Sequence, residues 1–134
     1  MKTRLVGLMA LAALAATAGP ALAHHSGAMF DRAKTLVLKG TLIEYQFVAP
    51  HAWISLLVPS PADETKMVRW DIEGGTAGRL KAQGVTPERL RPGDKITVKA
   101  HPLRDGRPGG GLVDITLADG TLVSNNPTKL QIGQ

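Results

Sequence analysis

The sequence predicts a mainly β domain: a small five-stranded OB-like barrel (oligonucleotide/oligosaccharide-binding type) with one short helix between strands three and four. Three observations predict this fold. A chain of 134 residues fits one domain. Its 15 glycines and 9 prolines recur between short apolar runs, which indicates many short strands. These runs follow the order three strands, helix, two strands. A simple β-sandwich is the alternative fold.

The first three strands are predicted from residue type and alternation. Residues 35–47 form a long first strand, in which Gly40 marks a bend that would let it pair on two sheet surfaces. A turn at 48–51 follows, because its proline cannot donate to a ladder. Residues 53–58 and 67–73 alternate apolar and polar side chains and form strands two and three.

The second half of the domain holds the helix and the last two strands. Residues 77–83 predict a short helix with Thr76 as its N-cap and Gly84 as its stop. Residues 86–90 predict a further turn of helix, with proline at its first position. The last strands are predicted at 95–100 and 112–117, separated by a Gly/Pro-rich loop over 101–111 and followed by a short extension at 122–123.

Residues 1–23 have the pattern of a signal peptide. Lys2 and Arg4 give a positive start, an apolar run follows at 5–18, and small residues at 21–23 form a cleavage site. The alternative is a membrane anchor, but the apolar run is shorter than the ~20 residues that span a bilayer. We therefore predict export to the periplasm with cleavage after the alanine at position 23.

Cleavage there leaves a single domain over 24–123 and a polar C-terminal tail over 124–134. The formal net charge of +5 falls by two with the leader, and no run of Lys or Arg forms a patch. We therefore expect no nucleic-acid partner, and no stable membrane insertion after cleavage. Expected partners are a metal ion, a small ligand or another envelope protein. The absence of cysteine excludes thiolate zinc sites, iron–sulfur clusters and thiol nucleophiles.

Copper binding is the chemistry that the histidines suggest. After cleavage His24 would be the first residue, and its α-amine and ring Nδ1 can chelate Cu(II), which favours such nitrogen ligands. His51, in a turn beside a strand, is the best distant third ligand. His25 offers another mode, through the amine, a deprotonated amide and its own ring. Cleavage after Ala21 would instead place His24 third, which is another Cu(II) chelate arrangement.

Each histidine also has a plainer interpretation. The His24-His25 end would be solvated and bind metal adventitiously. The ring of His51 would bond the backbone or cover Trp53. His101 would be a solvated loop residue, because it follows strand four and precedes a proline.

Two other groups of residues could carry chemistry. Asp71 and Glu73 are two residues apart on one strand, so their side chains share a face. This arrangement suits acid–base work, but a solvated polar face paired with Arg69 is the favoured interpretation. Met29 and Met67 are thioether candidates for Cu(I), and Met67 also suits packing at the start of a strand.

Several motifs in fixed order suggest a family. They are His24-His25-Ser26, Lys39-Gly40-Thr41, Pro50-His51-Ala52-Trp53, Trp70-x-x-Glu73-Gly74-Gly75, Pro92-Gly93-Asp94 and Leu117-Ala118-Asp119-Gly120. Together they resemble a family of small exported bacterial proteins of unknown function, over nearly the whole mature chain. Ala49 departs from the family pattern, which usually has Asn before the Pro-His pair. The resemblance implies a periplasmic barrel-like domain, and it implies no activity, substrate or catalytic residue.

The sequence thus predicts a non-enzymatic periplasmic protein that binds Cu(II) through the processed N-terminal histidine and His51. The alternative is a metal-free ligand-binding or interaction module of the envelope, which would use the barrel face around Tyr45, Trp53 and Arg69. An enzyme, such as a mononuclear copper oxidase with the same nitrogen ligands, ranks third, because no motif indicates a substrate groove.

Overall fold

The computed structural model describes residues 27–125. The predicted signal peptide, the ligands His24 and His25, and residues 126–134 of the predicted tail lie outside this range. Within residues 27–125, no helix is long and apolar enough to cross a membrane.

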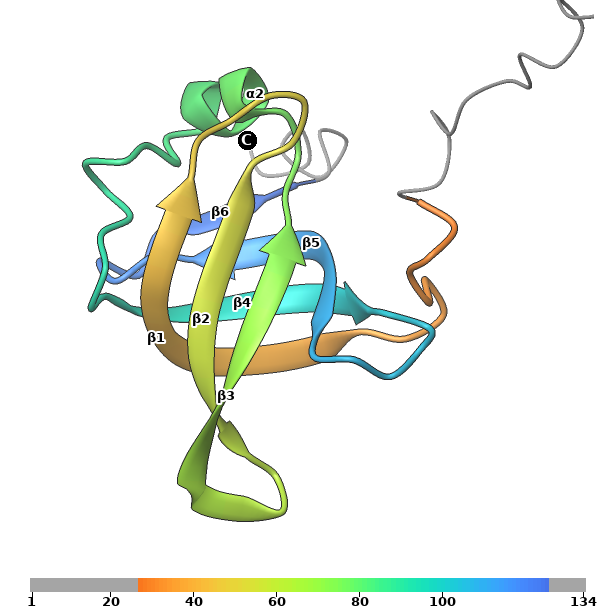
Figure 1. Cartoon of the computed structure of the whole chain (residues 1–134). Coiled ribbons are helices and arrows are strands. Elements are labelled where there is room, and N and C mark those ends of the chain that lie inside the picture. Colours follow the sequence, from red (N-terminus) through yellow and green to blue (C-terminus); the bar gives the residue numbers. More distant parts are fainter. Residues whose placement is uncertain (1–26, 126–134) are drawn as a thin grey trace, which may run out of the picture.

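The described chain folds as a closed ring of strands with one short helix, which confirms the predicted OB-like barrel (Figure 1). The elements are β1 (Leu36–Gln46), β2 (Trp53–Ser60), β3 (Asp63–Glu73), α2 (Ala77–Ala82), β4 (Lys95–Pro102), β5 (Gly109–Thr116) and β6 (Leu122–Ser124). The sheet order is β3-β2-β1-β4-β5-β6, and an additional β3–β5 pairing closes the ring. The predicted extension at 122–123 is thus a short sixth strand, paired with β5.

The first strand bends and serves two sheet surfaces, as predicted. Residues 36–41 of β1 pair with β4, and residues 41–46 pair with β2. Gly40 lies at the crossing, where a Cβ would collide with the backbone carbonyl oxygen of Leu57. Only glycine therefore allows β2 to approach this closely. The register shift in the β1–β2 ladder falls between Leu42 and Glu44, just beyond the glycine.

The prediction of a loop over 101–111 is wrong at both ends of that segment. Both ends are strands, and they take part in closing the barrel. His101 and Pro102 extend β4, and the three glycines at 109–111 begin β5. These glycines pair in parallel with residues 71–73 of β3. Glycine carries no strand signal in a sequence, but here it permits a close approach: a Cβ on Gly110 would collide with the carbonyl oxygen of His101.

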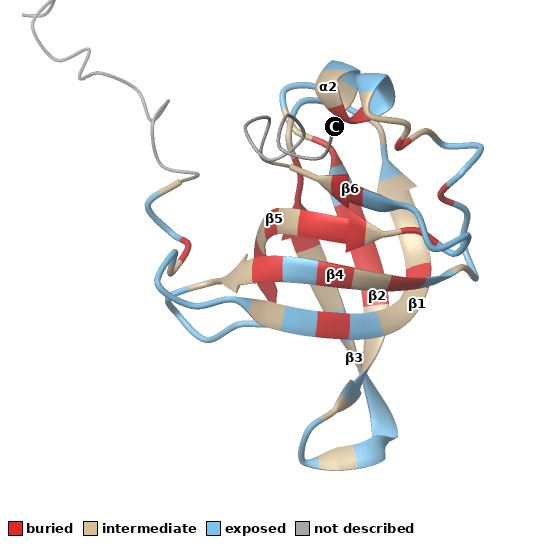
Figure 2. Cartoon of the chain, turned by 180° about the vertical axis from the view of Figure 1, so that it is seen from behind, coloured by how far each residue is buried: buried red, intermediate tan, exposed pale blue. Residues whose placement is uncertain are grey.

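The core fills the barrel and is covered at one end by α2 (Figure 2). Its fully buried large side chains are Leu42, Ile54, Leu56, Ile72, Leu80, Val85, Leu90, Val98 and Ile115. The hydroxyl of Thr76 accepts a hydrogen bond from the backbone N–H of Arg79, which confirms the predicted N-cap. Residues 86–90 form a hydrogen-bonded turn, not a helix, with Leu90 N–H donating to Thr86 O at 3.0 Å.

The folded domain extends two residues beyond the predicted boundary at 123. Ser124 belongs to β6, and the backbone N–H of Asn125 donates to Val113 O at 2.8 Å. The Asn125 side chain also donates to Leu112 O at 2.9 Å. These polar residues therefore act as part of the sheet edge, where their backbone and amide groups find partners on β5.

Candidate functional site

A cavity of about 460 Å³ lies where the N-terminal segment meets the closing strands of the barrel. We call it the histidine cavity, because two of the chain's four histidines line it. Its polar lining consists mainly of His51, His101, Glu73, Arg32, Arg79 and Asn125, and Gly27 and Phe30 also border it. The cavity thus brings together residues from the N-terminal segment, the β1–β2 loop, β3, α2 and β4.

His51 enters the cavity from the turn between β1 and β2, after a cis Ala49–Pro50 peptide bond. Its Nε2 lies 3.7 Å from Oε1 of Glu73, so the carboxylate faces one ring nitrogen. The other nitrogen, Nδ1, is buried and has no hydrogen-bond partner within residues 27–125. The side chain as a whole keeps 38% of its surface exposed. Within the described residues the ring of His51 therefore does not bond the backbone.

Glu73 differs from the solvated residue that the alternation of β3 suggests. Its side chain is only 9% exposed and faces His51. Asp71, two residues earlier, behaves as expected: it accepts a hydrogen bond from Nε of Arg69 at 2.9 Å and another from the hydroxyl of Ser55 at 2.6 Å. Glycines 109–111 of β5 pair with the end of β3, and Phe30 of the N-terminal segment packs over Gly111. Of the two carboxylates, only that of Glu73 is therefore buried.

The register of the sheet places His101 on the same face as Glu73. Glu73 pairs with Gly111 of β5, and Gly111 pairs with His101 of β4. Residues paired across neighbouring strands project to one face. The interpretation of His101 as a solvated loop residue is therefore wrong, because β4 continues through it. Its Nδ1 lies 2.7 Å from Lys34 O, and since a carbonyl only accepts, Nδ1 is the donor of this hydrogen bond.

Phe30 occupies the space that Gly111 leaves open. A Cβ on Gly111 would lie 2.9 Å from Cδ2 of Phe30, so the ring lies directly over this glycine. Phe30 is 8% exposed and forms an isolated bridge with Leu103. The ring therefore stands between Glu73 and His101. Within residues 27–125, no group of three or more His, Asp or Glu side chains is arranged to hold a metal ion.

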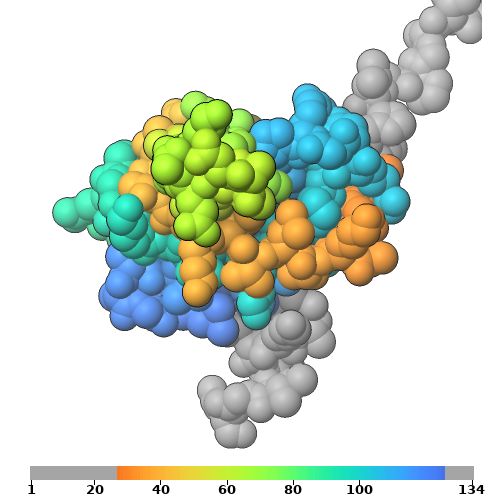
Figure 3. Space-filling view, turned by 90° about the horizontal axis from the view of Figure 1, so that it is seen from below, coloured from red at the N-terminus to blue at the C-terminus, as the bar shows by residue number. Residues whose placement is uncertain are grey.

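The N-terminal segment is attached along the end of β4 and the β4–β5 loop. Asp31 N–H donates to Pro102 O at 2.8 Å, and Arg104 N–H donates to Met29 O at 2.9 Å. In Figure 3 this segment, coloured orange, packs beside the loop. The attachment brings Gly27, the first described residue, to the wall of the histidine cavity. The predicted ligands His24 and His25 precede it by only a few residues.

A second cavity, of about 400 Å³, lies beside the first and shares Phe30 and Glu73 with it. It is lined by Trp53, Arg69 and Met29, among others. Met29 is thus placed near Glu73 but not in the histidine cavity.

Met67 lies elsewhere, 48% exposed, where it pairs with Pro59, so the structure does not bury it at the strand start.

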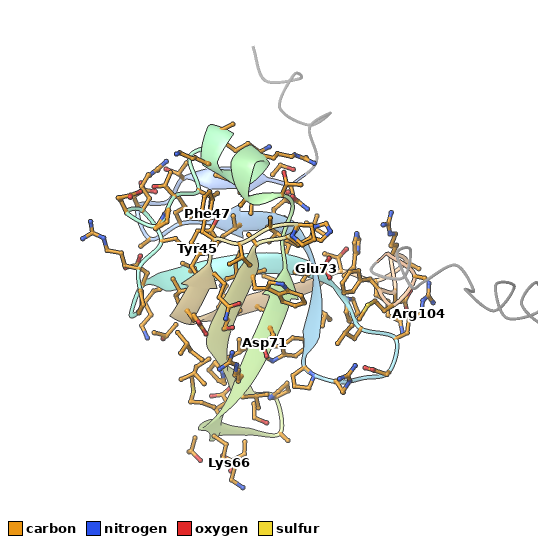
Figure 4. The ribbon with its side chains drawn as sticks, turned by 45° about the horizontal axis from the view of Figure 1, so that its top comes forward. Tyr45, Phe47, Lys66, Asp71, Glu73 and Arg104 are labelled. Atoms are coloured by element: carbon orange, nitrogen blue, oxygen red, sulfur yellow. The ribbon has the colours of Figure 1, made fainter. Side chains whose placement is uncertain are left out.

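Tyr45 does not join this second cavity. Figure 4 shows it beside Phe47, apart from Asp71 and Glu73 on β3. Its hydroxyl lies 3.4 Å from Val85 O, and burial raises the pKa of the phenol to about 12. Of the three residues proposed for a metal-free face, only Trp53 and Arg69 therefore line one cavity.

The fold and the cavity define a small OB-like β-barrel domain with a polar cavity at its closing seam. The chain belongs to a family of unknown function (DUF6152), whose model matches residues 11–112. Among solved structures, the mitochondrial single-stranded DNA-binding protein Rim1 of S. cerevisiae is similar at 15% identity and a TM-score of 0.47, covering 69% of this chain and 96% of that one. No curated protein matches the sequence.

Proposed function

We propose that the protein is an exported, non-enzymatic binding protein of the periplasm that holds Cu(II) between its processed N-terminus and His51. The α-amine and ring of His24 supply two nitrogens, and the ring of His51 supplies a third. His25 provides the alternative chelate through the amine and a backbone amide. Copper is the favoured metal because amine and imidazole nitrogens suit Cu(II), which heads the divalent affinity order.

The observation that carries this proposal is that Gly27 and His51 line the same cavity. Three residue steps separate His24 from Gly27, and a chain spans at most ~3.3–3.6 Å per residue. The new N-terminus would therefore lie within about 10 Å of Gly27, which itself lines the cavity. A leader cut elsewhere, or a longer N-terminus, would displace the amine from this reach.

The environment of His51 supports a ligand role. A carboxylate that faces one nitrogen of an imidazole orients the ring and raises the basicity of the other nitrogen, as in many metal sites. Glu73 stands in this relation to Nε2 of His51, and Nδ1 has no partner in the described part of the chain. A buried ring nitrogen without a partner is costly unless something else binds it.

The test is a Cu(II) titration of protein purified from the periplasm, after intact-mass analysis has fixed its first residue. We expect tight one-to-one binding that His24→Ala or His51→Ala weakens at least 100-fold. A further comparison adds one glycine before His24 in the His25→Ala variant, because in the unaltered chain the addition would place His25 third and create another Cu(II) chelate. In this background the addition keeps the His24 ring but moves the amine away from it, so it should weaken binding.

Binding of micromolar or weaker affinity that none of these changes affects would overturn the copper proposal. Loss in His25→Ala with retention in His51→Ala would identify the amide chelate in place of the three-nitrogen site. A first residue other than His24 would move the chelate to another register.

The second cavity favours a metal-free binding module as the alternative function. Trp53, at 37% exposure, and Met29, at 40%, leave apolar surface open beside Arg69. An apolar dye such as 1-anilinonaphthalene-8-sulfonate should then bind the metal-free protein, and Trp53→Leu should reduce its affinity. An added N-terminal glycine should have no effect on dye binding, which separates this function from copper binding.

A further inference from the structure

We propose that the histidine cavity is also a binding site for a small organic dicarboxylate, held between the guanidinium groups of Arg32 and Arg79. This inference goes beyond the proposed copper function and does not depend on it. Both arginines line the cavity, and they come from two separate elements, the N-terminal segment and α2. Figure 1 shows these elements well apart, with α2 at the top and the segment at the right.

The charge of the cavity lining favours an anion. The lining contains two guanidinium groups and one carboxylate, that of Glu73, which already lies beside the ring of His51. The lining therefore carries an excess positive charge even with both histidines neutral. Arginine cannot lose its proton in a protein, so this charge persists at every ordinary pH.

Arg32 is the clearest sign of an unfilled site. Its guanidinium has no hydrogen-bond or ion-pair partner within residues 27–125, although the six other arginines of this range pair with backbone or carboxylate oxygens: Arg69, Arg79, Arg89, Arg91, Arg104 and Arg107. A Cβ on Gly27 would lie 3.1 Å from Nη2 of Arg32, which places the guanidinium at the cavity wall. A planar fork of free donors matches the two oxygens of a carboxylate.

Arg79 supplies the second anchor. Nη2 of Arg79 donates a hydrogen bond to the backbone oxygen of Asn125. This bond fixes the Arg79 side chain at the cavity and uses one of the five N–H groups of the guanidinium. The remaining donors can bind a second carboxylate.

The cavity lining also includes Phe30, whose ring lies over Gly111, and Leu112. These apolar groups suit a short carbon chain better than an inorganic ion, so the ligand class is a dicarboxylate.

The test uses succinate as the probe, by isothermal titration of the full mature protein without metal. We expect saturable binding that Arg32→Gln weakens about tenfold or more, since hydrogen bonds between charged groups are the strong ones. Arg32 has no partner to lose in the described fold, so this variant should keep the stability of the wild type. Arg79→Gln should also weaken binding, and circular dichroism will show whether it folds.

Arg91→Gln is the matched control, because it removes the same charge from an exposed position outside the cavity. It should leave the affinity for succinate unchanged. Equal weakening by Arg32→Gln and Arg91→Gln would overturn the site in favour of diffuse attraction. Absence of saturable succinate binding would overturn it too, as would equal affinity for inorganic phosphate or for the uncharged diamide of succinate. None of these results depends on copper binding, so the two proposals fail separately.

Discussion

Replacing Gly111 with alanine tests the packing that builds the histidine cavity. The added Cβ would lie 2.9, 3.1 and 3.3 Å from three atoms of the Phe30 ring, where carbon atoms prefer 3.5–4.0 Å. The ring cannot simply turn away, because Phe30 is 8% exposed and bridged to Leu103. The N-terminal segment must shift with it.

Overpacking of this kind costs about 1–3 kcal/mol. For a domain of this size each kcal/mol corresponds to ~4–8 °C in melting temperature, so we expect a fall of roughly 4–24 °C. Urea unfolding followed by circular dichroism gives the free energy of unfolding. Gly78→Ala is the control: its Cβ would meet nothing within 4 Å, and its place inside α2 predicts a small gain in stability.

A double-mutant cycle identifies Phe30 as the cause. Phe30→Ala alone should destabilise the domain, because a buried aromatic ring is lost. Adding Gly111→Ala to that variant should cost almost nothing, since the obstructing ring is gone. The coupling energy should therefore equal most of the penalty of Gly111→Ala alone. An equal penalty in both backgrounds would refute the placement of Phe30 over Gly111, and with it the separation of Glu73 from His101 by the Phe30 ring.

Three further predictions concern charge. Glu73→Gln should weaken Cu(II) binding about tenfold or more while the fold persists, because the carboxylate that orients the ligand ring is lost; unchanged affinity in the titration would contradict this role. Tyr45, the chain's one tyrosine, should titrate near pH 12 in ultraviolet absorption, and stability should fall from about pH 10 upward, where the unfolded phenol ionises first. Hydrogen bonds from Thr121 and Arg89 lower the pKa of Asp119. The contribution of this carboxylate to stability is therefore present above about pH 4 and lost in stronger acid. Asp119→Asn should accordingly reduce the difference between the urea midpoints of unfolding at pH 6 and pH 2.

Local patterns of the sequence explain why most elements could be predicted. The alternation in 53–58, 67–73 and 95–100 reflects one buried and one exposed face, and the structure places strands at all three. Thr76 caps its helix through a bond three residues away. Gly40 stands out because a glycine inside an apolar run has few other uses. Each of these signals involves neighbours in the chain.

The site was only partly predictable. His51 was identified from its turn, and the structure places it in the histidine cavity. Its companions were missed: Glu73 shares the alternation of a solvated face, and His101 precedes a proline that suggests a loop. Arg32 and Arg79 carried no motif at all. One signal for Glu73 was available in the Trp-x-x-Glu-Gly-Gly motif. Its glutamate lies directly before Gly74 and Gly75, where an added Cβ would be crowded by Leu80 and Asn125 respectively.

The sequence by itself determined the alternating parts of the strands, the short helix and the barrel class. A strand with one buried face shows alternating apolar and polar side chains, and this pattern is visible within a short segment. Only the tertiary structure decided which polar residues meet. The contact of β3 with the glycines of β5 joins residues almost forty positions apart, and it brings Glu73, Gly111 and His101 into one row. Pairing between such distant segments depends on the closure of the whole ring, which no local pattern specifies.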